Sequence, residues 1–507
     1  MTQTLTTMQT AMTRRKLSVL AFCIFMLATL VRIPSCGESL WIDELHSVWC
    51  VWGSVGDVAE RAIAGNQTPF YFWGLWFWKL CGGDSEWSLR LPSVLASSAA
   101  AAIVAIGVAM SSRCRIAGVA AGSMLALESH AIFFGTEVRP FAAVMLMSAI
   151  ACWSMSLVEL SRQWRWTWLI GSTLVAASIQ PMSIGAFAWL IAIALVSETK
   201  FAKSIAIHWV GSPRILLVAV ALILIPTIYF GSRVLMTAWR YRAQWQTVGD
   251  AVTWQDVWRI WPWTAFLVVP LGLATISLAA GGKREGLWRY RMAFAAIMIT
   301  ITYWLVAVSG IAPVFHRRYL AACLPMLAWA AGDAIGVCVR AIRDHAAWRH
   351  REWFAVTIAM IPIAWVFWPH LAHLGSATSD VAFVRRGEDW RGASQFLGSH
   401  FDGRPVRLLP GLIETNRLLD STGEAATDAQ AYLSFPFRGP YRVNDVTVIA
   451  MSRIDAEDDS PIVVRGRRQL ANQIATLIRT QTRRQIAIHS FGRVHVIAND
   501  PGLATIP

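Results

Sequence analysis

The chain alternates long apolar stretches with short polar connections. Runs such as Leu17–Pro34, Pro92–Met110 and Phe141–Val158 are too long for the elements of a soluble core. About 17–25 apolar residues form a helix that crosses the ~30 Å hydrocarbon core of a bilayer. We therefore predict an α-helical polytopic membrane protein with about eleven transmembrane helices. These are expected near residues 17–34, 91–110, 116–134, 141–159, 166–180, 184–198, 214–230, 263–281, 291–310, 319–338 and 353–370.

Basic residues predict the orientation of these spans. With the N-terminus in the cytoplasm, every inside connection carries Lys or Arg, as the positive-inside rule requires. Examples are Arg14, Arg15, Lys16, Arg113, Arg115, Arg162, Arg165, Lys200, Lys203, Arg340 and Arg343. We expect a multi-pass protein of the cell (inner) membrane. An odd number of spans places residues 371–507 on the outer, periplasmic side.

One apolar run is shorter than the others. Residues Pro69–Leu80 cover only about a dozen positions and are rich in Tyr and Trp, which prefer the headgroup level. Counting this run as a span would place the later Arg-rich loops outside. We therefore predict an interfacial or re-entrant helix on the outer face, within one external loop over residues 35–90. The transmembrane domain is then 1–370, followed by an extracytoplasmic domain at 371–507.

Composition agrees with this interpretation and limits the partners. Of 507 residues, 55% are hydrophobic and 15% charged, against about a quarter charged in soluble proteins. The net charge of +14 is explained by membrane topology and some anion binding, so we expect a lipid bilayer and no nucleic acid as partner.

Beyond residue 371 the pattern changes to that of a small α/β domain. Strand-like runs are PVRLLP, AYLSF, VTVIAM, QIAIHS and RVHVIA. Two amphipathic helices are expected, GEDWRGASQFLGSHF and RQLANQIATLIRT. The second places Leu470, Ile474, Leu477 and Ile478 on one face.

The first external loop carries the adjacent carboxylates Asp43 and Glu44 in ESLWIDELHSVW. Desolvation among the neighbouring apolar residues would raise the pKa of such a carboxylate and suit it to general base chemistry. The same pair is also typical of a helix N-terminus, where the dipole favours acidic residues. Both interpretations stay open at this point.

Two further clusters lie at expected outer boundaries. Glu137 and Arg139 follow the third span, and are either part of a site or an inconsequential surface pair. His316, Arg317, Arg318 and Tyr319 precede the tenth span, against the positive-inside trend. A bound phosphate would explain these cations, because guanidinium binds phosphate in bidentate fashion. Attraction to anionic headgroups would explain them equally well.

The order of these features resembles a known family. A DE pair follows the first span, and PFYFW, GGDSEWSLRLPS, TEVRPF and HRRYLxxxLP come after it. Over residues 17–340 this resembles the GT-C superfamily of membrane glycosyltransferases, in particular the branch of protein O-mannosyltransferases and lipid A aminoarabinose transferases.

The resemblance implies a reaction and roles for the candidate residues. The donor would be a polyprenyl-phosphate sugar and the acceptor, of unknown kind, would lie on the outer face. Asp43 would be the catalytic acidic residue, and Glu44 would orient the acceptor. The donor phosphate would be held by Arg139, His316, Arg317 and Arg318, with Glu137 and Tyr319 as acceptor or loop contacts.

Some features depart from the family pattern. Phe141 stands where many relatives carry Tyr, and the turn QPMSIG replaces a Thr-His-Tyr type string. These differences bear on acceptor contacts and on the identity of the sugar. The first loop contains no DxD pair, so we predict no cofactor and no obligatory metal.

Two other classes of function compete with the enzyme. A transporter or flippase of a lipid-linked substrate would need ionisable residues near the middle of the spans or an internal repeat. The spans are nearly free of charge and no repeat is evident. A non-catalytic membrane scaffold would make the DE pair dispensable.

Overall fold

The structure is a computed structural model of the whole chain. It describes residues 14–156, 161–197, 213–245, 249, 251–260, 290–344, 352–374, 387–401, 403–412, 426–443, 446–451 and 454–499. The expected span at 263–281 lies outside these residues.

The chain divides into two compact units. The first, which we call the helical unit, comprises Met1–Cys36, Asn66–Tyr71 and Arg90–Val384. The second, the sheet unit, comprises Gly37–Gly65, Phe72–Leu89 and Arg385–Pro507. Large parts of the loop expected at 35–90 thus share a unit with the C-terminal residues.

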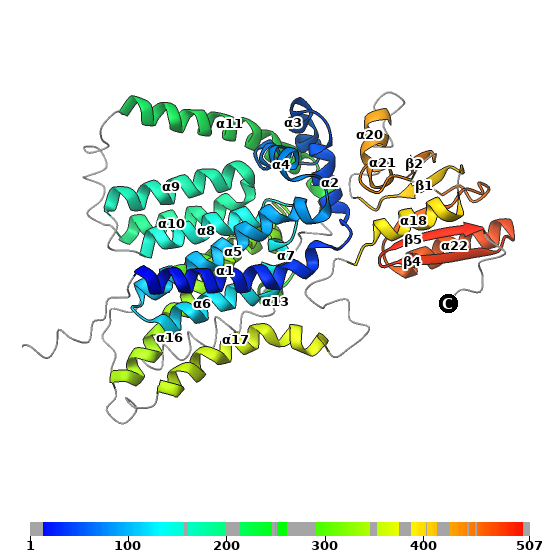
Figure 1. Cartoon of the computed structure of the whole chain (residues 1–507). Coiled ribbons are helices and arrows are strands. Elements are labelled where there is room, and N and C mark those ends of the chain that lie inside the picture. Colours follow the sequence, from blue (N-terminus) through cyan, green and yellow to red (C-terminus); the bar gives the residue numbers. More distant parts are fainter. Residues whose placement is uncertain are drawn as a thin grey trace, which may run out of the picture. The chain divides into compact units, whose positions relative to one another are not determined.

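The helical unit consists of long apolar helices, several of which run in nearly the same direction (Figure 1). Its helices are α1 (Arg14–Cys36), α5 (Glu86–Ser111), α6 (Arg115–Leu127), α7 (Ser129–Gly135), α8 (Phe141–Ser156), α9 (Arg162–Ile179), η1 (Pro181–Ser183), α10 (Ile184–Ser197), α11 (Pro213–Arg240), η2 (Arg242–Trp245), α13 (Gln255–Arg259), α15 (Arg291–Val308), η4 (Arg317–Leu320), α16 (Cys323–Asp344) and α17 (Glu352–Leu374). Two helices belong to both units: α4 (Pro69–Gly82) begins in the helical unit and continues in the sheet unit, and α5 begins in the sheet unit and continues in the helical unit.

Among the described residues, four helices are long and apolar enough to cross a membrane. They are Arg15–Cys36, Glu86–Ser111, Arg291–Val308 and Cys323–Arg343. Other expected spans appear as shorter apolar helices, such as Phe141–Ser156. The polytopic helical fold is therefore confirmed, while the count of eleven spans stays a prediction.

The third expected span is not one continuous helix. Helices α6 and α7 meet at an angle of 62°, and Glu128 lies at the break between them. The span expected over 116–134 is bent at this point because the Glu128 side chain accepts a hydrogen bond from Ala131 N and starts a new helix. The QPMSIG turn between the expected spans 166–180 and 184–198 is confirmed, and Pro181 is the first residue of η1.

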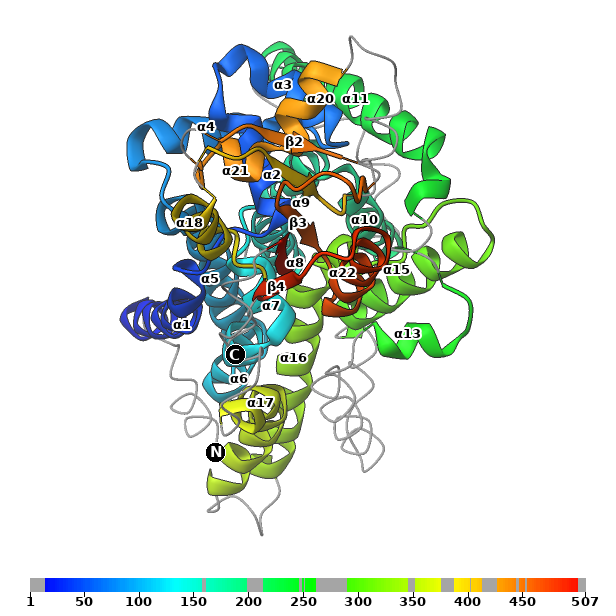
Figure 2. The ribbon, with the colours of Figure 1, turned by 90° about the vertical axis from the view of Figure 1, so that its right-hand side faces the viewer.

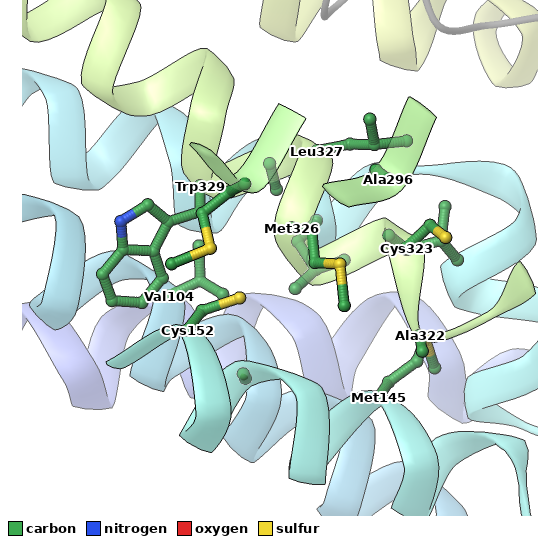
Figure 3. Packing of buried hydrophobic residues seen from close by; sticks show 14 of the residues in the cluster. Val104, Met145, Cys152, Ala296, Ala322, Cys323, Met326, Leu327 and Trp329 are labelled. Atoms are coloured by element: carbon green, nitrogen blue, oxygen red, sulfur yellow. The ribbon is translucent and has the colours of Figure 1, made fainter. Parts of the chain in front are cut away.

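The core of the helical unit is built around α16, which packs on α6, α8, α15 and α17. Trp329 of α16 is completely buried, among residues that include Val104, Cys152 and Met326 (Figure 3). Small residues permit this packing. A Cβ on Gly107 would lie 2.1 Å from the Trp329 ring, and one on Gly118 would lie 2.5 Å from the Ala105 carbonyl oxygen.

The sheet unit combines helices of the first loop with the C-terminal α/β elements. The former are α2 (Ile42–Trp52), α3 (Val55–Ala64) and most of α4. The latter are α18 (Trp390–His400), β1 (Val406–Leu409), α20 (Ala426–Leu433), α21 (Phe435–Arg438), β2 (Val448–Ala450), β3 (Ile462–Arg465), α22 (Arg468–Thr482), β4 (Ile486–Phe491) and β5 (Val494–Asn499).

The described strands form a mixed sheet in the order β2-β1-β3-β5-β4. Strand β1 pairs in parallel with β2 and β3, whereas β5 is antiparallel to β3 and β4. Helix α22 packs on the face that carries Ile462, Val464 and Ile497. Helix α18 contacts β4 and β5 (Figure 2). Its Phe396 meets His489 and Phe491, which lie on the opposite face from Ile486 and Ile488.

The structure of this region differs from the expectations in three respects. AYLSF is not a strand, since its residues lie in α20 and α21, and the strand β3 was not expected. In α22, Ile474 and Ile478 are buried as expected, but Leu470 and Leu477 are 41% and 44% exposed. Ala471 and Ala475 are buried in their place, because small side chains let the helix approach the sheet closely.

Candidate active site

The two carboxylates of the first loop have different surroundings. Both lie in the first turn of α2, where the helix dipole favours negative charge. Glu44 is completely buried, and its Oε2 accepts a hydrogen bond from Trp41 N at 3.3 Å. This bond satisfies a backbone donor that the start of a helix would otherwise leave without an intrahelical partner. Asp43 is half-buried, so its carboxylate is the more accessible of the two.

Glu137 and Arg139 are buried rather than on the surface, with 2% and 6% of their area exposed. The backbone forms a tight turn here, in which Arg139 N donates to the Glu137 carbonyl oxygen at 2.7 Å. Ser93 of α5 donates its hydroxyl to the same oxygen at 2.6 Å. The turn is thereby held against α5, and the description of these residues as a surface pair does not apply.

The basic cluster His316–Tyr319 surrounds the short helix η4. His316 precedes the helix, and its Nδ1 accepts hydrogen bonds from Arg318 N and Arg318 Nε, both at 3.2 Å. Both bonds come from the residue two positions further along, so the histidine ring and the Arg318 side chain hold each other in place at the start of η4. The Tyr319 ring lies 6.3 Å from that of His316. Arg317 is exposed, whereas Arg318 is half-buried.

The break between α6 and α7 adds residues that sequence analysis missed. The Glu128 carboxylate is buried and binds both Ala131 N and His130 Nδ1 at 2.7 Å. Partial desolvation lowers the pKa of Arg317, and the negative charge of Glu128 opposes that shift. The charge of Glu128 at the break therefore acts on Arg317 of η4, and both belong to the helical unit. The signal in the sequence was an acidic residue and a histidine within an otherwise apolar run.

A buried arginine supports the same break from α1. Arg32 donates to the carbonyl oxygens of Ala126 at 3.0 Å and Ala131 at 3.1 Å, on either side of the bend. It also donates to Ala28 at 2.8 Å. The guanidinium thus joins the last turn of α6 to α7, and it satisfies the Ala126 oxygen, which a continuous helix would have used.

The structure therefore groups the predicted residues in two sets. Arg139, Glu137 and the His316–Tyr319 cluster belong to the helical unit, together with Glu128 and His130. Asp43 and Glu44 belong to the sheet unit. Within the helical unit, η1 packs against η4. The QPMSIG turn, which differs from the family pattern, therefore borders the basic cluster.

The sequence and the fold are similar to those of known membrane glycosyltransferases. A family model described as dolichyl-phosphate-mannose-protein mannosyltransferase matches residues 66–230. This stretch includes the Glu128 break and the Glu137–Arg139 turn, and it ends before η4. The resemblance to GT-C membrane glycosyltransferases is thereby confirmed.

Two solved structures share the fold over nearly the whole chain. The crystal structure of ArnT from Cupriavidus metallidurans bound to undecaprenyl phosphate has a TM-score of 0.53 and 12% identity, covering 98% of this chain and 100% of that chain. The apo structure of the same protein gives a TM-score of 0.53 and 12% identity, with 97% and 99% covered. No curated protein matches the sequence significantly. The chain is a multi-pass membrane protein with a GT-C type fold.

Proposed function

We propose that the protein transfers a sugar from a polyprenyl-phosphate donor to an acceptor on the outer face of the membrane. The observation that carries this proposal is the fold. It extends over 98% of the chain and is shared with a protein crystallised with undecaprenyl phosphate. A lipid-linked donor also accounts for a catalytic domain made of apolar helices, because the lipid tail needs an apolar environment.

The donor phosphate is assigned to cations of the helical unit. Arg317 and Arg318 on η4 offer guanidinium groups, His316 can donate from Nε2, and Arg139 lies in the buried turn. Glu137 and Tyr319 flank these cations and are proposed as contacts to the acceptor or the loops. Fixed guanidiniums stabilise the charge that develops on the leaving polyprenyl phosphate.

The acceptor is assigned to Asp43. Its carboxylate takes the proton of an acceptor hydroxyl while the hydroxyl oxygen forms a bond to the anomeric carbon. The bond between that carbon and the phosphate oxygen breaks, and both of its electrons leave with the polyprenyl phosphate. Glu44 is assigned the orientation of the acceptor, and its bond to Trp41 N also stabilises the helix that carries Asp43.

The test is a transfer assay with the purified protein in lipid nanodiscs and a panel of radiolabelled polyprenyl-phosphate sugars. Asp43→Asn is expected to lower transfer by at least about 100-fold, the scale of general base catalysis, while the protein stays folded. Glu60→Gln is the matched control, since it removes an exposed carboxylate of the same loop. We expect chelation with EDTA to leave the rate unchanged.

The same preparation distinguishes the competing functions. Translocation of a labelled lipid across reconstituted vesicles, without transfer, would identify a flippase. Absence of both activities with every donor would point to a scaffold and refute the proposed transfer. Full activity of Asp43→Asn would refute the assignment of the base.

A further inference from the structure

The segment that leads into α2 is bound by side chains from the C-terminal part of the sheet unit. Arg391 donates from its guanidinium to the Gly37 carbonyl oxygen at 2.8 Å and from its backbone N–H to Ser39 Oγ at 3.3 Å. The Tyr441 hydroxyl accepts from Leu40 N at 2.7 Å and donates to Glu86 Oε1 at 2.8 Å. Residues 37–40 are thus attached at three successive points just before the helix.

Glu388 makes the next contact, on the helix itself. Its Oε2 accepts from Ile42 N at 3.0 Å and from Trp390 Nε1 at 2.9 Å. Its Oε1 accepts from Arg465 Nε at 2.7 Å. The Glu388 side chain is only 3% exposed, so the cation and the two N–H donors compensate the loss of water around a buried carboxylate.

The bond to Ile42 has a particular place in α2. Ile42 is the first residue of the helix, and its N–H is one of the four that have no partner within the helix. A carboxylate at this position also interacts favourably with the helix dipole. Glu388 therefore fixes both the start and the direction of α2, and Asp43 is the next residue along.

We propose that Glu388 is a positioning residue for Asp43, so that the C-terminal domain takes part in the reaction by holding the helix that carries the base. The inference rests on the proposed function, in which Asp43 accepts the proton. Displacing a reacting group by about 1 Å can lower a rate about 100-fold. A helix held at its first N–H by a buried ion pair avoids such displacement.

Glu388→Gln is the informative variant, because it keeps the shape of the side chain. One amide oxygen can still accept from Ile42 N, but the amide nitrogen then meets the N–H of Arg465, and two donors face each other. Arg465→Gln is a milder variant that leaves the carboxylate and its bonds to Ile42 and Trp390. Asp458→Asn is the matched control, since it breaks the ion pair with Arg407 on β1 of the same unit.

The experiment combines two measurements on the full-length protein in nanodiscs. Hydrogen exchange is followed in peptides covering residues 37–49, with peptides of β3 and β5 as a reference for the fold. Transfer kinetics give kcat and the donor KM separately. We expect Glu388→Gln to accelerate exchange in 37–49 alone and to lower kcat roughly 10- to 100-fold with little change in donor KM. Arg465→Gln should show both effects more weakly, and Asp458→Asn neither.

Each outcome decides the proposal. Unchanged exchange in 37–49, or unchanged kcat despite faster exchange, overturns the positioning role. Faster exchange throughout β3 and β5 as well indicates a general structural role and also overturns it. If the wild type transfers no sugar, the proposed function fails, while the exchange data still report whether Glu388 holds α2.

Discussion

Two neighbouring arginines of η4 differ in what their guanidinium groups can do. Arg318 directs Nε toward His316 Nδ1, which restricts its guanidinium to one side of the histidine ring. Arg317 is the more exposed of the two. Partial desolvation lowers its pKa, and the negative charge of Glu128 acts to raise it. The sequence RR does not distinguish them, because the difference depends on a hydrogen bond that only the folded turn creates.

Arg317→Gln should therefore weaken donor use more than Arg318→Gln. A hydrogen bond to a charged group contributes about 1.5–3 kcal/mol, so we expect kcat/KM for the donor to fall about 10- to 100-fold in Arg317→Gln. Arg318→Gln serves as the matched comparison and should show a smaller loss. Equal losses, or a larger one for Arg318→Gln, would contradict the assignment.

His495 of β5 predicts a pH dependence of stability. It is 2% exposed, with Nδ1 bonded to Ser490 Oγ at 3.0 Å and Nε2 to the Gly466 carbonyl oxygen at 3.2 Å. Burial lowers the pKa of His495, against the hydrogen bond to the Gly466 carbonyl oxygen, and the charge of Arg468 lowers it further. The unfolded chain thus binds the proton more readily than the folded protein does. The contribution of His495 to the free energy of unfolding is therefore complete above the unfolded pKa of about 6.5, and it decreases as the pH falls below that value.

This dependence can be measured as the melting temperature at pH 5 and pH 7.5. The decrease at acid pH should be smaller in His495→Gln than in the wild type. His400→Gln, which changes an exposed histidine of α18, should behave like the wild type. Identical pH profiles for wild type and His495→Gln would refute the contribution of this residue.

At the scale of elements, apolar runs locate helices well but not their breaks. The run over 116–134 is interrupted because Glu128 caps α7, a local event that hydropathy averages out. Conversely, α11 continues to Arg240, beyond the expected end of its span at residue 230. AYLSF has strand-like composition but becomes helical, since packing in the sheet unit overrides weak local propensity.

Helix packing in the core predicts a stability effect at Gly107. A methyl group there would lie 2.1 Å from the completely buried Trp329 ring, so α5 or α16 has to move. We expect Gly107→Ala to destabilise the protein by about 1–3 kcal/mol, the usual effect of overpacking. Thermal unfolding in detergent measures it.

Gly171→Ala provides the control for that measurement. Gly171 lies inside α9, and a Cβ there meets nothing within 4 Å. Alanine has the higher helix propensity by ~1 kcal/mol, so this variant should be as stable as the wild type or more so. A Gly107→Ala protein as stable as Gly171→Ala would show that the close approach to Trp329 does not limit the packing.

At the scale of the whole molecule, the chain does not divide where its hydropathy changes. The change near residue 371 predicts one boundary, but residues 37–65 and 72–89 share a compact unit with 385–507. Leu40 and Tyr441 illustrate the reason. They are 401 positions apart and joined by a 2.7 Å hydrogen bond, and no local pattern encodes such a pairing.

The sequence by itself determined the membrane class, most helices, most of the strands and the residues worth testing. Hydrophobic length, charge placement and residue type are local properties that the printed chain displays directly. Only the tertiary structure decided that Glu137 and Arg139 are buried and that Glu388 binds the start of α2. These facts depend on which distant groups meet when water is excluded, because a buried polar group requires a partner and the fold alone determines which one it finds.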